Sequence, residues 1–176
     1  MIIYLKNKHT LQVDDFFFKC CIGKNGISSN KIEGDKKTPR GFFQLDNLYC
    51  RKDKIRNVST KLRLINIKKS MGWCDDVQNK NKYNKLIKIK KTIKCEKLFR
   101  KDYKYDLLIP IKYNFKKPIL GKGSCIFVHL TNNYKPTAGC IALKKNDFLI
   151  MLKLLKKKKT KLKYINSLNQ IFLNLF

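Results

Sequence analysis

The chain has 176 residues, 43% of them hydrophobic and 11% aromatic, which is enough apolar material for one domain with its own core and excludes an intrinsically disordered protein. Its 41 Lys and Arg residues outnumber 12 Asp and Glu residues, and the formal net charge of +29 attracts polyanions without choosing among nucleic acid, anionic lipid and wall polymer. The basic residues are mostly lysine and no groove-entering module is recognisable, so a solvated lysine-rich surface is favoured over a nucleic-acid reader.

The amino-terminal residues contain no secretory apolar core, because the apolar run 2–5 is short and charged residues follow it. No later run has the length of a membrane span, so the sequence alone indicates a cytoplasmic protein without a transmembrane segment. Cysteines have no regular spacing, and His9 and His129 are the only histidines. We therefore expect free thiols, no disulfide framework and no metal site. The cysteines are Cys20, Cys21, Cys50, Cys74, Cys95, Cys125 and Cys140.

The first half of the chain alternates short apolar runs with polar segments, which is typical of a β-rich domain. The run 16–22 is expected to be buried on both faces of a sheet. Residues 23–41, interrupted by glycines and a proline, are expected to form a long loop. Residues 73–76 follow a strand and are expected to form a loop at the wall of a cleft. The strands predicted in this half are 2–5, 16–22 and 61–67.

The second half contains the clearest strand signal, an alternation over residues 105–113 in which Pro110 indicates that one side lacks a strand partner. Residues 95–101 predict a short helical turn, and apolar residues at helical spacing predict a helix around 148–155. An amphipathic tail begins at residue 166. The remaining predicted strands are 86–93 and 158–165, both at sheet edges, and 123–130.

The candidate site is a histidine and a cysteine on either side of a polar loop. In the segment GSCIFVHLTNNYKPTAGCIAL, strand alternation places His129 on the same face as Cys125. Gly139 permits a sharp turn that would expose the sulfur of Cys140 and bring backbone N–H groups near it. An adjacent imidazole that takes the thiol proton yields a nucleophilic thiolate. Alternatively, the cysteine is a buried small hydrophobe and the histidine a satisfied core residue.

The flanking pattern resembles the active-site signature of L,D-transpeptidases, the YkuD-type cysteine enzymes of peptidoglycan cross-linking. Two positions depart from the commoner signature: Ala138 replaces a second histidine, and Ala142 replaces an arginine or asparagine. The pattern is that of a divergent branch with the signature TxGC. Further blocks that resemble the family in the same order are KIEGDKKTPRGFFQL, MGWCDD, YN, YDLLIPIKYN, GSCIFVHL and TAGCIAL.

The resemblance implies a mainly β (α+β) fold, a single-domain two-sheet β-sandwich at residues 1–165 with one longer carboxyl-terminal helix, followed by the tail 166–176. It implies that Cys140 forms a thioester with a peptidoglycan stem peptide and that His129 acts as base and then as acid. Thr137 would orient the other ring nitrogen of the histidine, and N–H groups near Gly139 would hold the oxyanion. Such a reaction needs no cofactor, and its substrate implies the cell envelope.

Four further residues could contact substrate, although packing inside the protein is an open alternative for each. They are Trp73, Thr38, Pro39 and Gly41. Other functions also remain open. A thiol peptidase or carboxypeptidase would use water in place of an acceptor amine at the same site. A basic nucleic-acid or polyanion-binding protein would have no use for Cys140 as a nucleophile. The sequence does not choose the donor, the acceptor, the export route or the oligomeric state.

Overall fold

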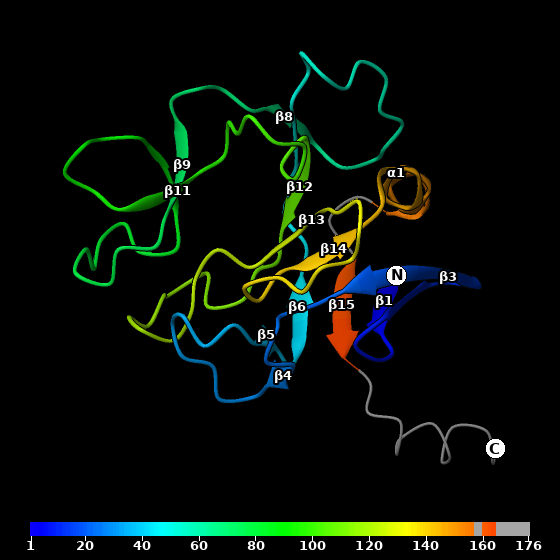
Figure 1. Ribbon diagram of the computed structural model, residues 1–176, viewed down its shortest axis with the longest axis horizontal. Coiled ribbons are helices and arrows are strands. Elements are labelled where there is room, and N and C mark those ends of the chain that lie inside the picture. The colour runs from blue at the N-terminus through cyan, green and yellow to red at the C-terminus, as the bar shows by residue number, and fades with distance from the viewer. Residues whose placement is uncertain (157–159, 165–176) are drawn as a thin grey trace.

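The computed structural model describes residues 1–156 and 160–164, which form β-strands and one α-helix (Figure 1). Within these residues one ten-stranded sheet has the order β6-β15-β1-β2-β3-β14-β13-β12-β7-β8. Its strands are β1 (Ile2–Leu5), β2 (Thr10–Val13), β3 (Phe16–Cys21), β6 (Phe42–Gln44), β7 (Leu48–Cys50), β8 (Leu64–Asn66), β12 (Leu107–Pro110), β13 (Phe127–Leu130), β14 (Ile141–Leu143) and β15 (Lys161–Tyr164). The architecture confirms the predicted mainly β class.

Two smaller sheets and the helix accompany the large sheet. The three-stranded sheet has the order β10-β9-β11, and β4 pairs with β5 in parallel. These elements are β4 (Ile27–Ser28), β5 (Thr38–Pro39), β9 (Met71–Cys74), β10 (Leu86–Lys88), β11 (Cys95–Lys97) and α1 (Lys145–Leu154). The helix has three buried apolar side chains at helical spacing, at Phe148, Met151 and Leu152, as the sequence pattern predicted.

The large sheet curls so that both of its halves contribute to one apolar core. This core contains Ile3 and Leu11 from one half, Leu107 and Val128 from the other, and the apolar face of α1. Each fully buried side chain of this size contributes about 2 kcal/mol through removal of apolar surface from water. The core therefore holds the two halves and the helix in one domain.

A second apolar cluster lies on the opposite face of β13. Alternation along this strand directs Val128 and Leu130 to the main core, whereas Phe127 packs with Trp73 and Cys140 in the second cluster. In Figure 1 the helix α1 and the β9–β11 region accordingly lie on opposite sides of β13. His129 shares the face of Phe127, so the candidate base lies on the side covered by the three-stranded sheet.

Several local predictions were wrong. Residues 95–97 form the strand β11, because Cys95 to Lys97 pair antiparallel with β9, and the predicted helical turn is absent there. Phe16 and Phe17 are 51% and 65% exposed, so this end of β3 is not buried on both faces as predicted. The strand β15 is not at an edge, since it pairs with both β1 and β6.

The two predictions about unpaired strand edges had different outcomes. The side of Pro110 that was expected to lack a partner is occupied by Asp46, whose backbone N–H donates to the carbonyl oxygen of Pro110 at 2.9 Å, while Phe127 of β13 pairs with the proline on the other side. The strand β10 lies at the edge of its sheet. The predicted tail 166–176 lies outside the described residues. In the part of the chain that the structure describes, no helix has the length and apolar character needed to cross a membrane, and no group of metal-ligating side chains gathers.

Candidate active site

The parallel pairing of β13 with β14 brings the histidine and the cysteine to neighbouring strands. Val128 pairs with Ile141 and His129 with Ala142, so Cys140, which immediately precedes β14, lies opposite Phe127. Cys140 and His129 are therefore two positions apart along adjacent strands. Both line one cavity of about 500 Å³. The structure brings together the two residues that the sequence singled out.

The thiol of Cys140 is held by backbone groups. Its Sγ lies 3.2 Å from the carbonyl oxygen of Cys125, to which it donates, and 3.3 Å from the backbone nitrogen of Phe127, whose N–H it accepts. The residue is 8% exposed, and burial raises the pKa of the thiol to about 12. At neutral pH the sulfur therefore keeps its proton until a base removes it.

The imidazole of His129 is oriented by the protein backbone. Its Nδ1 lies 2.9 Å from the carbonyl oxygen of Leu130, and because a carbonyl only accepts, Nδ1 carries the proton. Burial lowers the pKa of His129 to about 4, with a smaller contribution in the same direction from the charge of Lys104. The ring is therefore neutral at physiological pH, and its Nε2 is an unprotonated acceptor. The ring of Tyr105 packs edge-on against it, with centroids 5.4 Å apart.

Thr137 holds the turn and not the imidazole, which corrects the role expected for it. Its hydroxyl donates to the carbonyl oxygen of Cys140 at 2.6 Å and accepts the N–H of Gly139 at 3.1 Å. The ring nitrogen that Thr137 was expected to orient is instead taken by Leu130. Because the N–H of Gly139 is already donated, the N–H of Cys140 is the better candidate for an oxyanion donor at this turn.

A smaller cavity of about 220 Å³ is also lined by Cys140. Ala138, Cys140, Tyr105 and Glu96 line both cavities, so the two cavities adjoin at the cysteine. Beyond these shared residues, the larger cavity carries the cationic side chains of Arg100, Lys104 and Lys135, and the smaller one carries Lys31, Lys36, Glu33 and Asp75. The arrangement suits an extended substrate that passes over the cysteine.

The sequence matches the family model of the L,D-transpeptidase catalytic domain over residues 1–163. The chain belongs to the L,D-transpeptidase family. A comparison with curated proteins gives no match. Among solved structures, the chain is similar to the helical cell shape determining protein Pgp2 from Campylobacter jejuni, with 19% identity, a TM-score of 0.53 and coverage of 94% of this chain and 47% of that one. A point mutant of the same protein matches with equal identity and TM-score and 46% coverage of its own chain. The chain thus spans about half the length of these structures.

Both departures from the commoner L,D-transpeptidase signature lie at the walls of the cavities. Ala138 lines both of them, and Ala142 lines the larger one beside His129. A methyl group at each position leaves space that the histidine and the arginine or asparagine of the commoner signature would fill. The methyl side chains of these two residues thus form part of the cavity walls in this L,D-transpeptidase domain.

Trp73 is buried, which corrects its expected contact with substrate. It belongs to the strand β9 and is 2% exposed. Its Nε1 donates to Asn84 Oδ1 at 2.9 Å, and its ring packs edge-on against Tyr49 and Phe127. The tryptophan packs against Phe127 of β13, the strand that also contains His129, as the packing alternative proposed.

Thr38, Pro39 and Gly41 likewise lie away from the two cavities that Cys140 lines. Thr38 and Pro39 form the buried strand β5. Gly41 lies against the ring of Phe43 and accepts a hydrogen bond from the backbone of Tyr164. These residues of the L,D-transpeptidase block pack inside the domain, and the hydroxyl of Thr38 donates to the carbonyl oxygen of Gly139 in the turn 137–140, which we call the nucleophile turn.

Tyr105, Glu96 and Arg100 were not singled out from the sequence, yet all three line the larger cavity. Arg100 donates to Glu96 at 3.0 Å and to Asp102, and its guanidinium lies 5.1 Å from the ring centre of Tyr105. Tyr105 stands at the start of the clearest alternating segment, which placed it near a strand but gave no sign of its contact with His129. The position of Glu96 depends on the pairing of β11 with β9, which the sequence did not predict.

Proposed function

We propose that the protein is a cysteine acyltransferase that acts on the stem peptides of peptidoglycan. The observation that supports this most strongly is the geometry of the pair: Cys140 and His129 face one cavity from adjacent strands, and the histidine has its Nδ1 engaged and its Nε2 available as a base. Membership of the L,D-transpeptidase family supplies the substrate class.

In the first half of the reaction, Cys140 Sγ attacks the carbonyl carbon of the amide before the terminal D-residue of the stem peptide. His129 Nε2 takes the thiol proton as the S–C bond forms, because the thiol is not ionised at rest. The N–H of Cys140 stabilises the negative charge on the carbonyl oxygen. The amide C–N bond then breaks, the amine of the D-residue leaves with the proton from His129, and a thioester remains.

In the second half, an acceptor amine attacks the thioester and gives its proton to His129. The C–S bond breaks, a new amide forms, and the sulfur recovers its proton from the imidazolium. Water in place of the amine would give a carboxypeptidase at the same site. No residue of the proposed mechanism requires a cofactor.

The test is to incubate the protein with a stem tetrapeptide and a peptide amine, and to follow the released terminal D-residue and the new amide by mass spectrometry. We expect release and transfer with wild type, and a loss of at least about 1,000-fold in Cys140→Ala, which lacks the nucleophile. Release without transfer assigns the hydrolytic reaction. Equal release by wild type and Cys140→Ala would refute the proposed nucleophile.

A further inference from the structure

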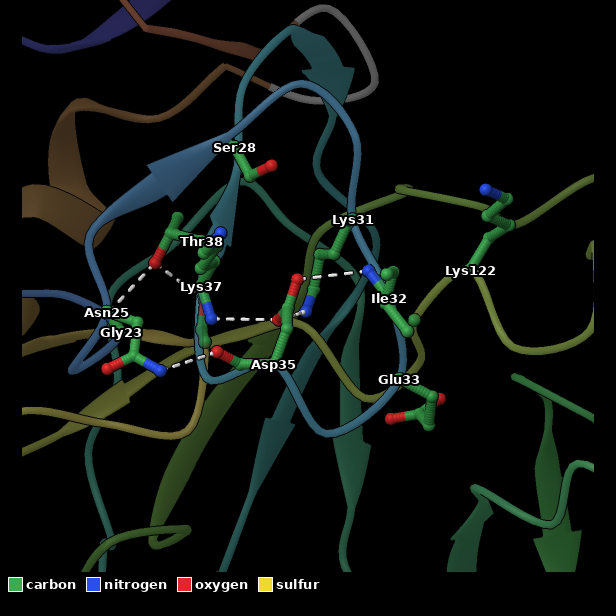
Figure 2. A network of polar contacts seen from close by, with 12 residues as sticks. Gly23, Asn25, Ser28, Lys31, Ile32, Glu33, Asp35, Lys37, Thr38 and Lys122 are labelled. Carbon is green, nitrogen blue, oxygen red and sulfur yellow. Dashed lines mark hydrogen bonds and ion pairs between the residues drawn. The ribbon is translucent and has the colours of Figure 1, made fainter.

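The loop that precedes β5 is organised by one carboxylate. Asp35 accepts hydrogen bonds from Lys31 Nζ at 2.6 Å and from the backbone N–H groups of Ile32 at 3.0 Å and Lys37 at 2.9 Å (Figure 2). Lys31 is 3% exposed. Burial opposes ionisation of Asp35, but the bonds from Lys31 and the two backbone groups prevail and hold its pKa below the usual value. The segment 31–37 is thus a fixed support for the residue that follows it.

That residue, Thr38, contacts the nucleophile turn 101 positions later in the chain. Its hydroxyl donates to the carbonyl oxygen of Gly139 at 2.8 Å and accepts the N–H of Gly23 at 3.0 Å. Thr38 is 1% exposed, so water does not compete for these bonds. The backbone approaches equally closely, because a Cβ on Gly139 would lie 2.8 Å from the carbonyl oxygen of Lys37.

The carbonyl that Thr38 binds belongs to the same peptide unit as the N–H of Cys140. This peptide is planar and trans, so its C=O and N–H point in opposite directions. A hydroxyl that holds the Gly139 oxygen therefore also sets the direction of the Cys140 N–H, which points away from Thr38. In the described part of the chain, no loop or side-chain acceptor takes up that N–H.

We propose that Thr38 is the positioning residue of the oxyanion site: it fixes the Gly139–Cys140 peptide so that the Cys140 N–H stays directed at the carbonyl oxygen of the substrate. Thr38 touches neither substrate nor reacting atoms and acts through the peptide. The role rests on the proposed acyl transfer at Cys140. It gives a role to the hydroxyl at this buried position, since its single oxygen accepts from Gly23 and donates to Gly139 at once.

The test compares three variants of the full chain. Thr38→Val keeps the shape but removes both bonds, Thr38→Ser keeps both, and Thr160→Val is the matched control. Thr160 is also buried, and its hydroxyl likewise donates to one backbone carbonyl and accepts one backbone N–H, both of Lys156, far from Cys140 in the chain. Both valine variants should lose thermal stability to a similar extent, because each leaves a buried donor and acceptor unpaired.

Only Thr38→Val should affect the chemical step. We expect its kcat for release of the terminal D-residue to fall about 10- to 100-fold while KM changes less than about twofold, since the lost interaction acts in the transition state. Thr38→Ser should retain kcat within about threefold of wild type. A kcat for Thr38→Val equal to that of Thr160→Val, or a fall in Thr38→Ser as large as in Thr38→Val, would overturn the positioning role.

A second readout needs no turnover and separates this role from the proposed function. The amide ¹H–¹⁵N resonance of Cys140 should shift or broaden in Thr38→Val and keep its wild-type position in Thr38→Ser and Thr160→Val. If wild type neither releases nor transfers a D-residue but these shifts occur, the acyl transfer is wrong and the control of the peptide by Thr38 stands. An unchanged Cys140 resonance in Thr38→Val would refute that control whatever the activity.

Discussion

At the scale of single residues, the site combines two groups that burial keeps neutral. The same desolvation that raises the pKa of Cys140 to about 12 lowers that of His129 to about 4. A resting ion pair is thereby disfavoured, and in the proposed reaction charge develops only when the S–C bond forms. The backbone donors around the sulfur and the oxyanion then matter more than the resting acidity of the thiol.

This electrostatic arrangement predicts the pH dependence of kcat/KM. The base must be unprotonated, so activity should be lost as the pH falls through about 4, well below the value of about 6.5 for an ordinary histidine. Rates of D-residue release between pH 3 and 8 would show the acidic limb. Because the carboxyl groups of Glu96 and Asp75 also face the cavities, His129→Gln is the control: its residual rate should lack this limb. A limb near pH 6.5 in wild type would contradict the buried, neutral imidazole.

At the scale of elements, the nucleophile turn depends on a segment from the other end of the chain. Gly139 has a φ of +136°, a conformation that side chains disfavour, and Lys37 fills the space that a Cβ would occupy. Two hydroxyl groups hold Gly139 in this turn. Thr137, within the turn, accepts its N–H, and Thr38, from a distant segment, donates to its carbonyl oxygen. The loop 31–37 therefore supports this turn, and its residues Lys31, Glu33, Gly34 and Lys36 also line the smaller cavity.

Gly139→Ala should accordingly cost more than an ordinary glycine replacement. Gly34→Ala is the matched control, because Gly34 also has a positive φ, of +79°, but no atom lies within 4 Å of its added Cβ. We expect Gly34→Ala to lower the free energy of unfolding by about 1 kcal/mol, from backbone strain alone. Gly139→Ala adds a clash with backbone and should lower it by about 2–4 kcal/mol. Urea unfolding measures both, and equal losses would mean that the contact with Lys37 does not hold the turn.

The sequence predicted the elements whose pattern is local. Alternation located β13, and the apolar spacing of α1 located the helix. It failed where pairing between distant segments decides the structure. Cys95 to Lys97 became a strand because β9 offers an antiparallel edge, and Thr38 became a support of Gly139 through a contact that no local pattern encodes. Strand alternation and the turn at Gly139 drew attention to His129 and Cys140, but the catalytic role expected for them came from the resemblance of the flanking residues to the family signature.

At the scale of the whole molecule, the main core and the candidate site lie on opposite faces of the curled sheet at β13. Its main core joins both halves of the sheet and α1, while the opposite face of β13 carries Phe127, His129 and the second cluster. The sequence could not foresee this division, because it depends on which face of β13 the three-stranded sheet covers. The net charge of +29 belongs to the surface as a whole. A charge of this sign favours the binding of anionic polymers in general. The proposed acyl transfer depends instead on the cavity around the thiol of Cys140.

The most direct measurement of the central claim is covalent trapping of the thiol. A carbapenem presents a strained amide to the proposed nucleophile and oxyanion donor, so intact mass spectrometry should show one adduct per chain, mapped to Cys140 among the seven cysteines. The adduct should be absent from Cys140→Ala and from denatured protein, and the small residues Ala138 and Ala142 are compatible with slow acylation. Labelling of several cysteines without preference, or no adduct after prolonged incubation, would contradict an organised acyl-transfer site at Cys140.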